Sequence, residues 1–222
     1  MRDDAFLDRR EAGRTLAAKL RQYGGRTDVV VLALPRGGVP VAHEVANALR
    51  APLDVFLVRK LGTPGRRELA MGAIASGGIR VLNDDVVRWL GITPEQIEAA
   101  ARAEQAELER REALYKEGRS SPTLRERIVI LVDDGLATGS TMRAAVQAVR
   151  QQHPARIIVA VPVGAPDTCG ELRSLADEVV CARTPEPFSA VGQWYLNFDQ
   201  TTDDEVRALL RESSPTVSSP RP

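Results

Sequence analysis

The sequence predicts an α/β protein built around a parallel β-sheet. Four continuous apolar runs rich in β-branched residues indicate strands that are buried on both faces, which is typical of parallel sheets. Segments of helical length separate these runs, and such alternation of strand and helix is typical of a sheet covered by helices. A length of 222 residues suits one globular domain.

The expected elements follow in chain order. An amphipathic helix comes first, over 2–22, and the glycine pair at 24–25 ends it. The strands are expected at 29–34, 53–58, 128–132 and 157–163, with a short fifth strand at 178–182. The helices that alternate with them are expected at 39–50, 140–152 and 167–176.

One highly charged segment, 84–118, interrupts the alternation. Residues 93–96 read Thr-Pro-Glu-Gln, the pattern of a capping box with proline in the first helical position. Acidic and basic residues follow at i,i+4 spacing, and the apolar positions are too sparse for a coiled-coil seam. We therefore expect a solvated helical insertion within a single domain over 1–212. The Ser/Pro-rich tail, 213–222, is expected to be disordered.

Composition excludes several classes of protein. Hydrophobic residues make up 43% and charged residues 27%, which is neither a disordered chain nor a membrane protein. The longest segment without a charged residue or histidine, 187–198, is too short to span a bilayer. Thirty basic residues balance thirty acidic ones, without the basic excess of a nucleic-acid binder. We expect no nucleic-acid partner and no membrane partner.

The cysteines and the first residues indicate the compartment. Cys169 and Cys181 form no CxxC pattern and have no histidine nearby, which excludes a zinc ribbon and a disulfide framework. We expect both to be buried apolar residues of a reducing compartment. The chain starts without the apolar region of a signal peptide. The expected localisation is therefore cytoplasmic.

Residues 130–142 carry the sharpest chemical pattern. A buried strand ends in Asp133 and Asp134, and a loop of small and hydroxyl residues then leads into a helix. A helix N-terminus offers free N–H groups and a positive dipole to an anion. Two carboxylates beside a phosphate would repel it unless they bind hydroxyl groups or a cation. The pattern lacks the lysine of a Walker A loop and predicts a site for a phosphorylated sugar. Its small and hydroxyl residues are Gly135, Ala137, Thr138, Gly139, Ser140 and Thr141.

This segment resembles the phosphoribosyl-pyrophosphate (PRPP) signature of type I phosphoribosyltransferases, most closely in their adenine-specific branch. Residues 33–40 resemble the pyrophosphate loop of the xanthine/guanine enzymes. Residues 58–64 resemble the start of the mobile catalytic loop, which would run to about Gly78. The resemblance implies a Rossmann-like phosphoribosyltransferase core with a C-terminal hood at about 183–200.

The resemblance also implies an activity and residue roles. The enzyme would transfer 5-phosphoribosyl from PRPP and Mg²⁺ to a nitrogenous base, with a purine favoured, and release pyrophosphate. Asp133 and Asp134 would hold the ribose hydroxyls directly or through the metal, and loop 137–141 would hold the 5-phosphate. Cations and glycines from the two other motifs would bind the pyrophosphate, and Lys60 would also assist the departure of the pyrophosphate. These cations and glycines are Arg36, Gly37, Gly38, Arg59 and Lys60.

Base recognition departs from the purine enzymes. Hypoxanthine/guanine enzymes have an aspartate where Ala137 stands, whereas adenine enzymes use a carboxylate of the mobile loop, for which Glu68 is the candidate here. Phe188 lies in an aromatic segment that faintly resembles the purine hood and is the candidate for stacking on the base. The identity of the acceptor stays open.

Two other interpretations compete with the enzyme. A regulator that senses PRPP would keep the binding motif without efficient transfer. A response-regulator-like receiver would need an acidic pair near the first strand and a lysine after a later strand, and neither is present. The sequence leaves a homodimer open.

Overall fold

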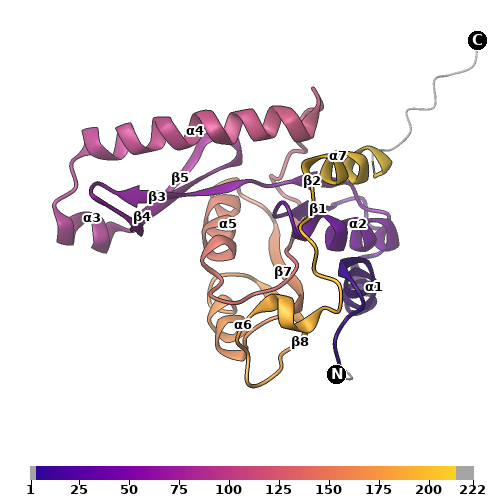
Figure 1. Ribbon diagram of the computed structural model, residues 1–222. Coiled ribbons are helices and arrows are strands. Elements are labelled where there is room, and N and C mark those ends of the chain that lie inside the picture. The colour runs from indigo at the N-terminus through magenta and orange to yellow at the C-terminus, as the bar shows by residue number, and fades with distance from the viewer. Residues whose placement is uncertain (1–3, 214–222) are drawn as a thin grey trace, which may run out of the picture.

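The computed structural model describes residues 4–213, apart from the side chains of residues 67 and 68. Five parallel strands form the main sheet in the order β2-β1-β6-β7-β8 (Figure 1). The predicted fold class is confirmed. The strands are β1 (Val29–Ala33), β2 (Leu53–Val55), β6 (Ile128–Val132), β7 (Arg156–Val163) and β8 (Glu178–Arg183).

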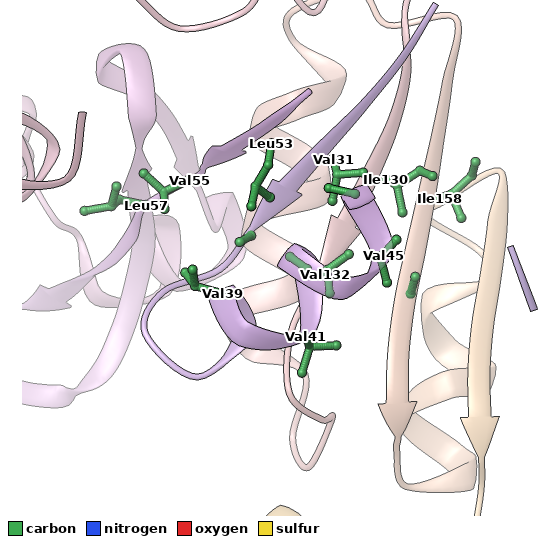
Figure 2. Close-up of a cluster of buried hydrophobic side chains, with 14 of the residues drawn as sticks. Val31, Val39, Val41, Val45, Leu53, Val55, Leu57, Ile130, Val132 and Ile158 are labelled. Atoms are coloured by element: carbon green, nitrogen blue, oxygen red, sulfur yellow. The ribbon is translucent and has the colours of Figure 1, made fainter. Parts of the chain in front are cut away.

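Helices cover both faces of this sheet (Figure 1). On one face lie α1 (Arg9–Lys19), α2 (Gly38–Leu49) and α7 (Asp203–Glu212), and on the other lie α5 (Ser140–Arg150) and α6 (Pro166–Leu172). Neighbouring strand residues point to opposite faces, so Val31 packs against the first group and Leu32 against the second. Figure 2 shows the first cluster, where Val31 and Ile130 of the sheet face Val45 of α2.

The first helix is shorter than predicted. It begins at Arg9 because the Asp8 side chain caps it by accepting from the Glu11 N–H, and a 3₁₀ turn, Arg21–Tyr23, follows its end. Among residues 4–213, no helix combines the length and apolar character needed to cross a membrane.

A second, three-stranded antiparallel sheet lies where a mobile loop over 60–78 was expected. It consists of β3 (Val58–Thr63), β4 (Arg66–Ala75) and β5 (Ile79–Leu82), with a 3₁₀ turn, Ser76–Gly78, between the last two. The expectation of a loop was wrong because the side chains of this sheet extend the main hydrophobic core. Leu61 and Met71 are completely buried against Ala101 of the long helix α4 (Pro94–Lys116).

The helical character of 84–118 is confirmed. A short helix, α3 (Asp84–Leu90), precedes α4, which runs along the second sheet (Figure 1). The capping box is present, since the Thr93 hydroxyl accepts from the Gln96 N–H while the Gln96 side chain accepts from the Thr93 N–H. The tail at 214–222 lies outside the described residues.

Candidate functional site

The loops after β1 and β6 touch at the carboxyl edge of the main sheet. These strands are neighbours, and open α/β sheets bind ligands at this edge. A Cβ on Gly37 would come within 2.0 Å of Asp134 Oδ2, and one on Gly38 within 2.9 Å of the Asp133 Cα. Only glycine permits so close an approach, and the two predicted binding loops therefore form one surface.

Each of these loops leads directly into the N-terminus of a helix. The N-cap of α2 is Gly37 and that of α5 is Gly139, which has φ +67°, and no described side chain caps either helix. Side chains cap four other helices, α1, α3, α4 and α7, through Asp8, Asn83, Thr93 and Thr202, whereas no side chain of the described residues caps the short helix α6. Uncapped N–H groups and the helix dipole favour an anion at the start of α5. At the start of α2, Gly38 and Val39 donate to the carbonyls of Leu34 and Arg36 and residue 40 is a proline, so only the helix dipole favours an anion there.

The two aspartates are half-buried beside these helix ends. Burial raises the pKa of Asp133 above its ordinary value, and the neighbouring charge of Asp134 adds to the increase. Burial also raises the pKa of Asp134, while the guanidinium of Arg9 opposes the rise. Arg9 Nε lies 2.9 Å from Asp134 Oδ2. The two carboxyl groups can form hydrogen bonds with the hydroxyl groups of a ligand.

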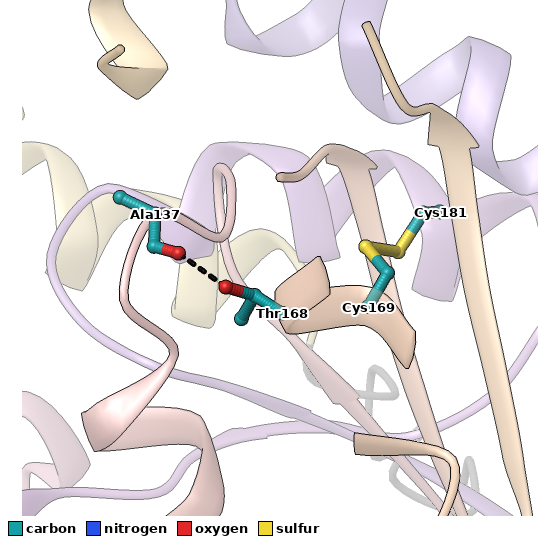
Figure 3. The surroundings of a disulfide bond; sticks show 4 residues. All are labelled: Ala137, Thr168, Cys169 and Cys181. Carbon is teal, nitrogen blue, oxygen red and sulfur yellow. Dashed lines mark hydrogen bonds between the residues drawn. A yellow bond between two sulfur atoms is a disulfide. The ribbon is translucent and has the colours of Figure 1, made fainter. Parts of the chain in front are cut away.

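Side chains from behind support the loop at 135–139. The Thr168 hydroxyl donates to the carbonyl of Ala137 at 2.6 Å, as Figure 3 shows. Arg143 donates to the carbonyl of Thr138 at 2.5 Å and forms an ion pair with Glu171. These bonds engage carbonyl groups, and the loop's position is thereby set without using the N–H groups at the start of α5.

The predicted cations lie in three different environments. Lys60 is exposed and lines a cleft of about 580 Å³ between the second sheet and α5, together with Ser140. Arg59 points the other way on the same strand and pairs with Glu104 of α4 at 2.5 Å. Arg36 reaches toward Asp203 of α7, at 3.8 Å. The structure therefore brings Lys60 to the start of α5 but does not bring Arg59 there.

Sequence comparison identifies the family. The model of the phosphoribosyl transferase domain matches residues 4–198, which include both loops and the acidic pair. The chain belongs to the phosphoribosyl transferase family. The resemblance based on three short motifs is thus confirmed over most of the chain.

Relatives of this chain occur in two bacteria. Two Mycobacterium tuberculosis proteins, from strains CDC 1551 and H37Rv, are 52% identical over 205 residues and are provisionally named phosphoribosyl transferases. The match covers 92% of this chain and 46% of each relative, so the chain spans about half the length of these relatives. The crystal structure of TT1426 from Thermus thermophilus is 44% identical with a TM-score of 0.85, covering 95% of this chain and all of that one.

A disulfide lies behind the loop at 135–139. Cys169 of α6 and Cys181 of β8 are bonded, which corrects the expectation of two unpaired cysteines (Figure 3). The helix α6 folds back over β8, so residues twelve apart in the chain meet on one face. Gly164 completes the contact, because a Cβ there would come within 2.6 Å of Cys169 Sγ. No spacing pattern in the sequence signals this pairing.

The hood segment packs against the start of the chain. Phe188 stacks on Trp194 with ring centroids 6.4 Å apart, and it is half-buried in that contact. Phe6 forms a parallel bridge with Tyr195. The stacking role of Phe188 toward a base stays a prediction. The Glu68 side chain lies outside the described part of the structure, so its role also stays a prediction.

Sequence reasoning missed the residues that hold the site from outside its motifs. Arg9 and Tyr195 contact Asp134, and Thr168 contacts Ala137. No local pattern in the sequence indicates these contacts, because each joins residues that are far apart in the chain.

Proposed function

We propose that this phosphoribosyl transferase transfers the 5-phosphoribosyl group of PRPP to a nitrogenous base, with a purine as the favoured acceptor, and releases pyrophosphate. The observation that carries the proposal is a pair of half-buried aspartates between the uncapped N-terminus of α5, at Gly139, and the loop that leads into α2. PRPP carries phosphate groups at both ends of a ribose that has vicinal hydroxyls. Two anion sites flanking hydroxyl acceptors suit that molecule.

Each part of the site has a distinct task in this proposal. The N-terminus of α5 would hold the 5-phosphate, and the loop that leads into α2 would hold the pyrophosphate. Asp133 and Asp134 would accept hydrogen bonds from the ribose hydroxyls and so fix the sugar between the two anion sites. Lys60 would place a positive charge at the cleft beside Ser140. Fixed dipoles and cations would stabilise the charge that develops on the leaving pyrophosphate.

The donor set fits Mg²⁺ bound together with the substrate. Mg²⁺ is usually held by one or two carboxylates, by water and by substrate phosphates. Asp133 and Asp134 supply two carboxylates beside the proposed anion sites. Within residues 4–213, no cluster of three or more His, Cys, Asp or Glu side chains could hold a metal without the substrate. When bound, Mg²⁺ would neutralise charge on the leaving pyrophosphate.

Thermal unfolding with PRPP tests the binding half of the proposal. Ligand at about 100 times its dissociation constant adds about 2.7 kcal/mol of stability, which should raise the midpoint by about 5–10 °C in a chain of this size. The shift should require Mg²⁺ and be lost in Asp133→Asn and in Thr138→Ala. Ser174→Ala is the matched control, because it also removes one hydroxyl group, which donates to the carbonyl of Glu171 and lies away from the loop.

Pyrophosphate release with a panel of purine and pyrimidine bases tests the transfer half. Turnover with one base would identify the acceptor class. A PRPP-dependent shift without release from any base would instead support a PRPP-binding regulator. Absence of any shift with PRPP would refute both functions.

A further inference from the structure

Arg9 joins the acidic pair to the distant segment 198–199. Its Nε donates to Asp134 Oδ2 at 2.9 Å, and a second guanidinium nitrogen donates to the carbonyl of Asp199 at 2.7 Å. The guanidinium also lies over the Phe198 ring, 3.9 Å from its centroid. Only 12% of the Arg9 side chain is exposed. Three separate contacts thus fix one side chain that lies outside all the predicted motifs.

The neighbouring residue Tyr195 also holds the backbone of Asp134. The Tyr195 hydroxyl donates to the Asp134 carbonyl at 2.6 Å. Main-chain hydrogen bonds tie the segment 194–197 to residues 6 and 7, just before Arg9: Phe6 N–H donates to Trp194, and Leu196 and Asn197 donate to Phe6 and Leu7. Asp134 is therefore held through both its side chain and its main chain.

The pairing leaves one carboxylate oxygen of Asp134 for a ligand. Oδ2 is enclosed between Arg9 and the backbone of Gly37, where a Cβ would come within 2.0 Å of it. No described residue forms a hydrogen bond with Oδ1 of Asp134. The ion pair is mostly shielded from solvent, and Arg9 is itself held by Asp199 and Phe198. Arg9 therefore restricts the Asp134 carboxylate to one orientation. That orientation presents Oδ1 as the acceptor.

We propose that Arg9 is a positioning residue for ribose recognition: it orients Asp134 so that Oδ1 accepts from a ribose hydroxyl. This inference rests on the proposed function, because it assumes that the acidic pair binds the sugar of a phosphoribosyl ligand. Arg9 acts through Asp134 and does not bind the anion at the start of α2 or of α5. The consequence is a defect that depends on whether the ligand contains ribose.

Calorimetric titration of Arg9→Gln with two ligands tests the inference. Ribose 5-phosphate contains the hydroxyls, whereas inorganic pyrophosphate does not. In Arg9→Gln we expect the Kd of ribose 5-phosphate to rise at least tenfold and that of pyrophosphate, with Mg²⁺, to stay within twofold. Arg9→Lys keeps the charge but loses the second donor and should lie between the wild type and Arg9→Gln.

Arg183→Met is a matched control. Arg183 also lies over an aromatic ring of the same region, 3.9 Å from the Phe6 centroid, and donates to the carbonyl of Asp4, but it does not contact Asp134. Its affinities for both ligands should equal those of the wild type. Phe198→Ala is the second test variant should Arg9→Gln not fold, because the Phe198 side chain is partly exposed and supports the guanidinium from one face. It should weaken ribose 5-phosphate a few-fold and leave pyrophosphate unchanged.

Each remaining outcome decides the question. The inference would be overturned if Arg9→Gln bound ribose 5-phosphate with the affinity of the wild type. It would also be overturned if the variant bound more tightly, since Arg9 would then obstruct Asp134. Equal losses for both ligands would show a general structural role and would also overturn it, while the proposed function stands. If the wild-type protein bound neither ligand nor PRPP, the proposed function itself would fail. If Arg9→Gln does not fold, unchanged binding by Phe198→Ala and Arg9→Lys would overturn the inference.

Discussion

The backbone of Gly37 lies against the Asp134 carboxylate, so that a Cβ on Gly37 would come within 2.0 Å of Oδ2. Gly37 has φ −59° and ψ −32°, a conformation open to any residue. Glycine is therefore required here by the contact and not by the backbone conformation. This contact couples the loop before α2 to the acidic pair, the two parts that a phosphoribosyl ligand would bridge.

Gly37→Ala should therefore disturb the site more than the fold. The added methyl group must displace Asp134 or the loop, and overpacking of this kind costs about 1–3 kcal/mol of unfolding free energy. PRPP affinity should fall at least tenfold. Urea unfolding and calorimetric titration measure the two effects.

Gly170→Ala provides the control for that substitution. A Cβ on Gly170 meets nothing within 4 Å, and the residue lies inside helix α6. Alanine there should leave ligand affinity unchanged and stabilise the protein by about 0.5–1 kcal/mol. Equal behaviour of the two variants would contradict the role assigned to Gly37.

Lys60 and Arg59 should differ although they are neighbours of like charge. Successive side chains of a strand point to opposite faces, which places Lys60 at the cleft with Ser140 and Arg59 against Glu104. Lys60→Met should weaken PRPP binding about ten times more than Arg59→Met. Arg59→Met should lower stability by at most about 1 kcal/mol, because its ion pair is partly exposed. Equal effects of the two substitutions on PRPP binding would contradict the placement of Lys60, and not Arg59, at the ligand site.

The sequence was most informative where local signals determine the structure. Strand β6 (Ile128–Val132) has the predicted bounds because charged residues flank a continuous β-branched run. The loop at 135–139 could be placed for the same reason, since small residues between a buried strand and a helix form a local pattern. The capping box at the start of α4 is equally local.

Contacts between distant residues could not be predicted. Strand β4 (Arg66–Ala75) begins with charged residues and has no clean alternation, and it is a strand because β3, β5 and α4 pack around it. Arg9 and Asp134 are 125 positions apart. Such contacts depend on the tertiary fold, and a single sequence gives no local sign of them.

Reduction of the Cys169–Cys181 disulfide should destabilise the protein. Closing a loop of this length restricts the unfolded chain by about 3 kcal/mol, so a phosphine reductant should lower the thermal midpoint by about 5–10 °C. Cys169→Ser/Cys181→Ser should show the same midpoint with and without reductant. An unchanged midpoint of the wild type, with two thiols titrated before and after unfolding, would contradict the bond.

Tyr115 should make stability depend on pH in the alkaline range. Burial and the hydrogen bond that its hydroxyl donates to Asp203 at 2.6 Å raise the pKa of Tyr115 to about 12. The pKa in the unfolded chain is about 10. The native state thus favours the protonated phenol, and its contribution is complete below pH 10 and is lost as pH rises from about 10 to 12.

The comparison of the wild type with Tyr115→Phe isolates this contribution. At pH 8 the variant should be less stable by about 1 kcal/mol, because it lacks one hydrogen bond between α4 and α7. The difference should narrow above pH 10, since only the wild type must then keep the Tyr115 phenol protonated in order to fold. Other alkaline titrations, including those of Tyr23 and Tyr195, are common to both proteins and cancel in the difference. Urea unfolding at pH 8, 9, 10 and 11 measures it, and a difference that stays constant over this range would show that Tyr115 has an ordinary pKa.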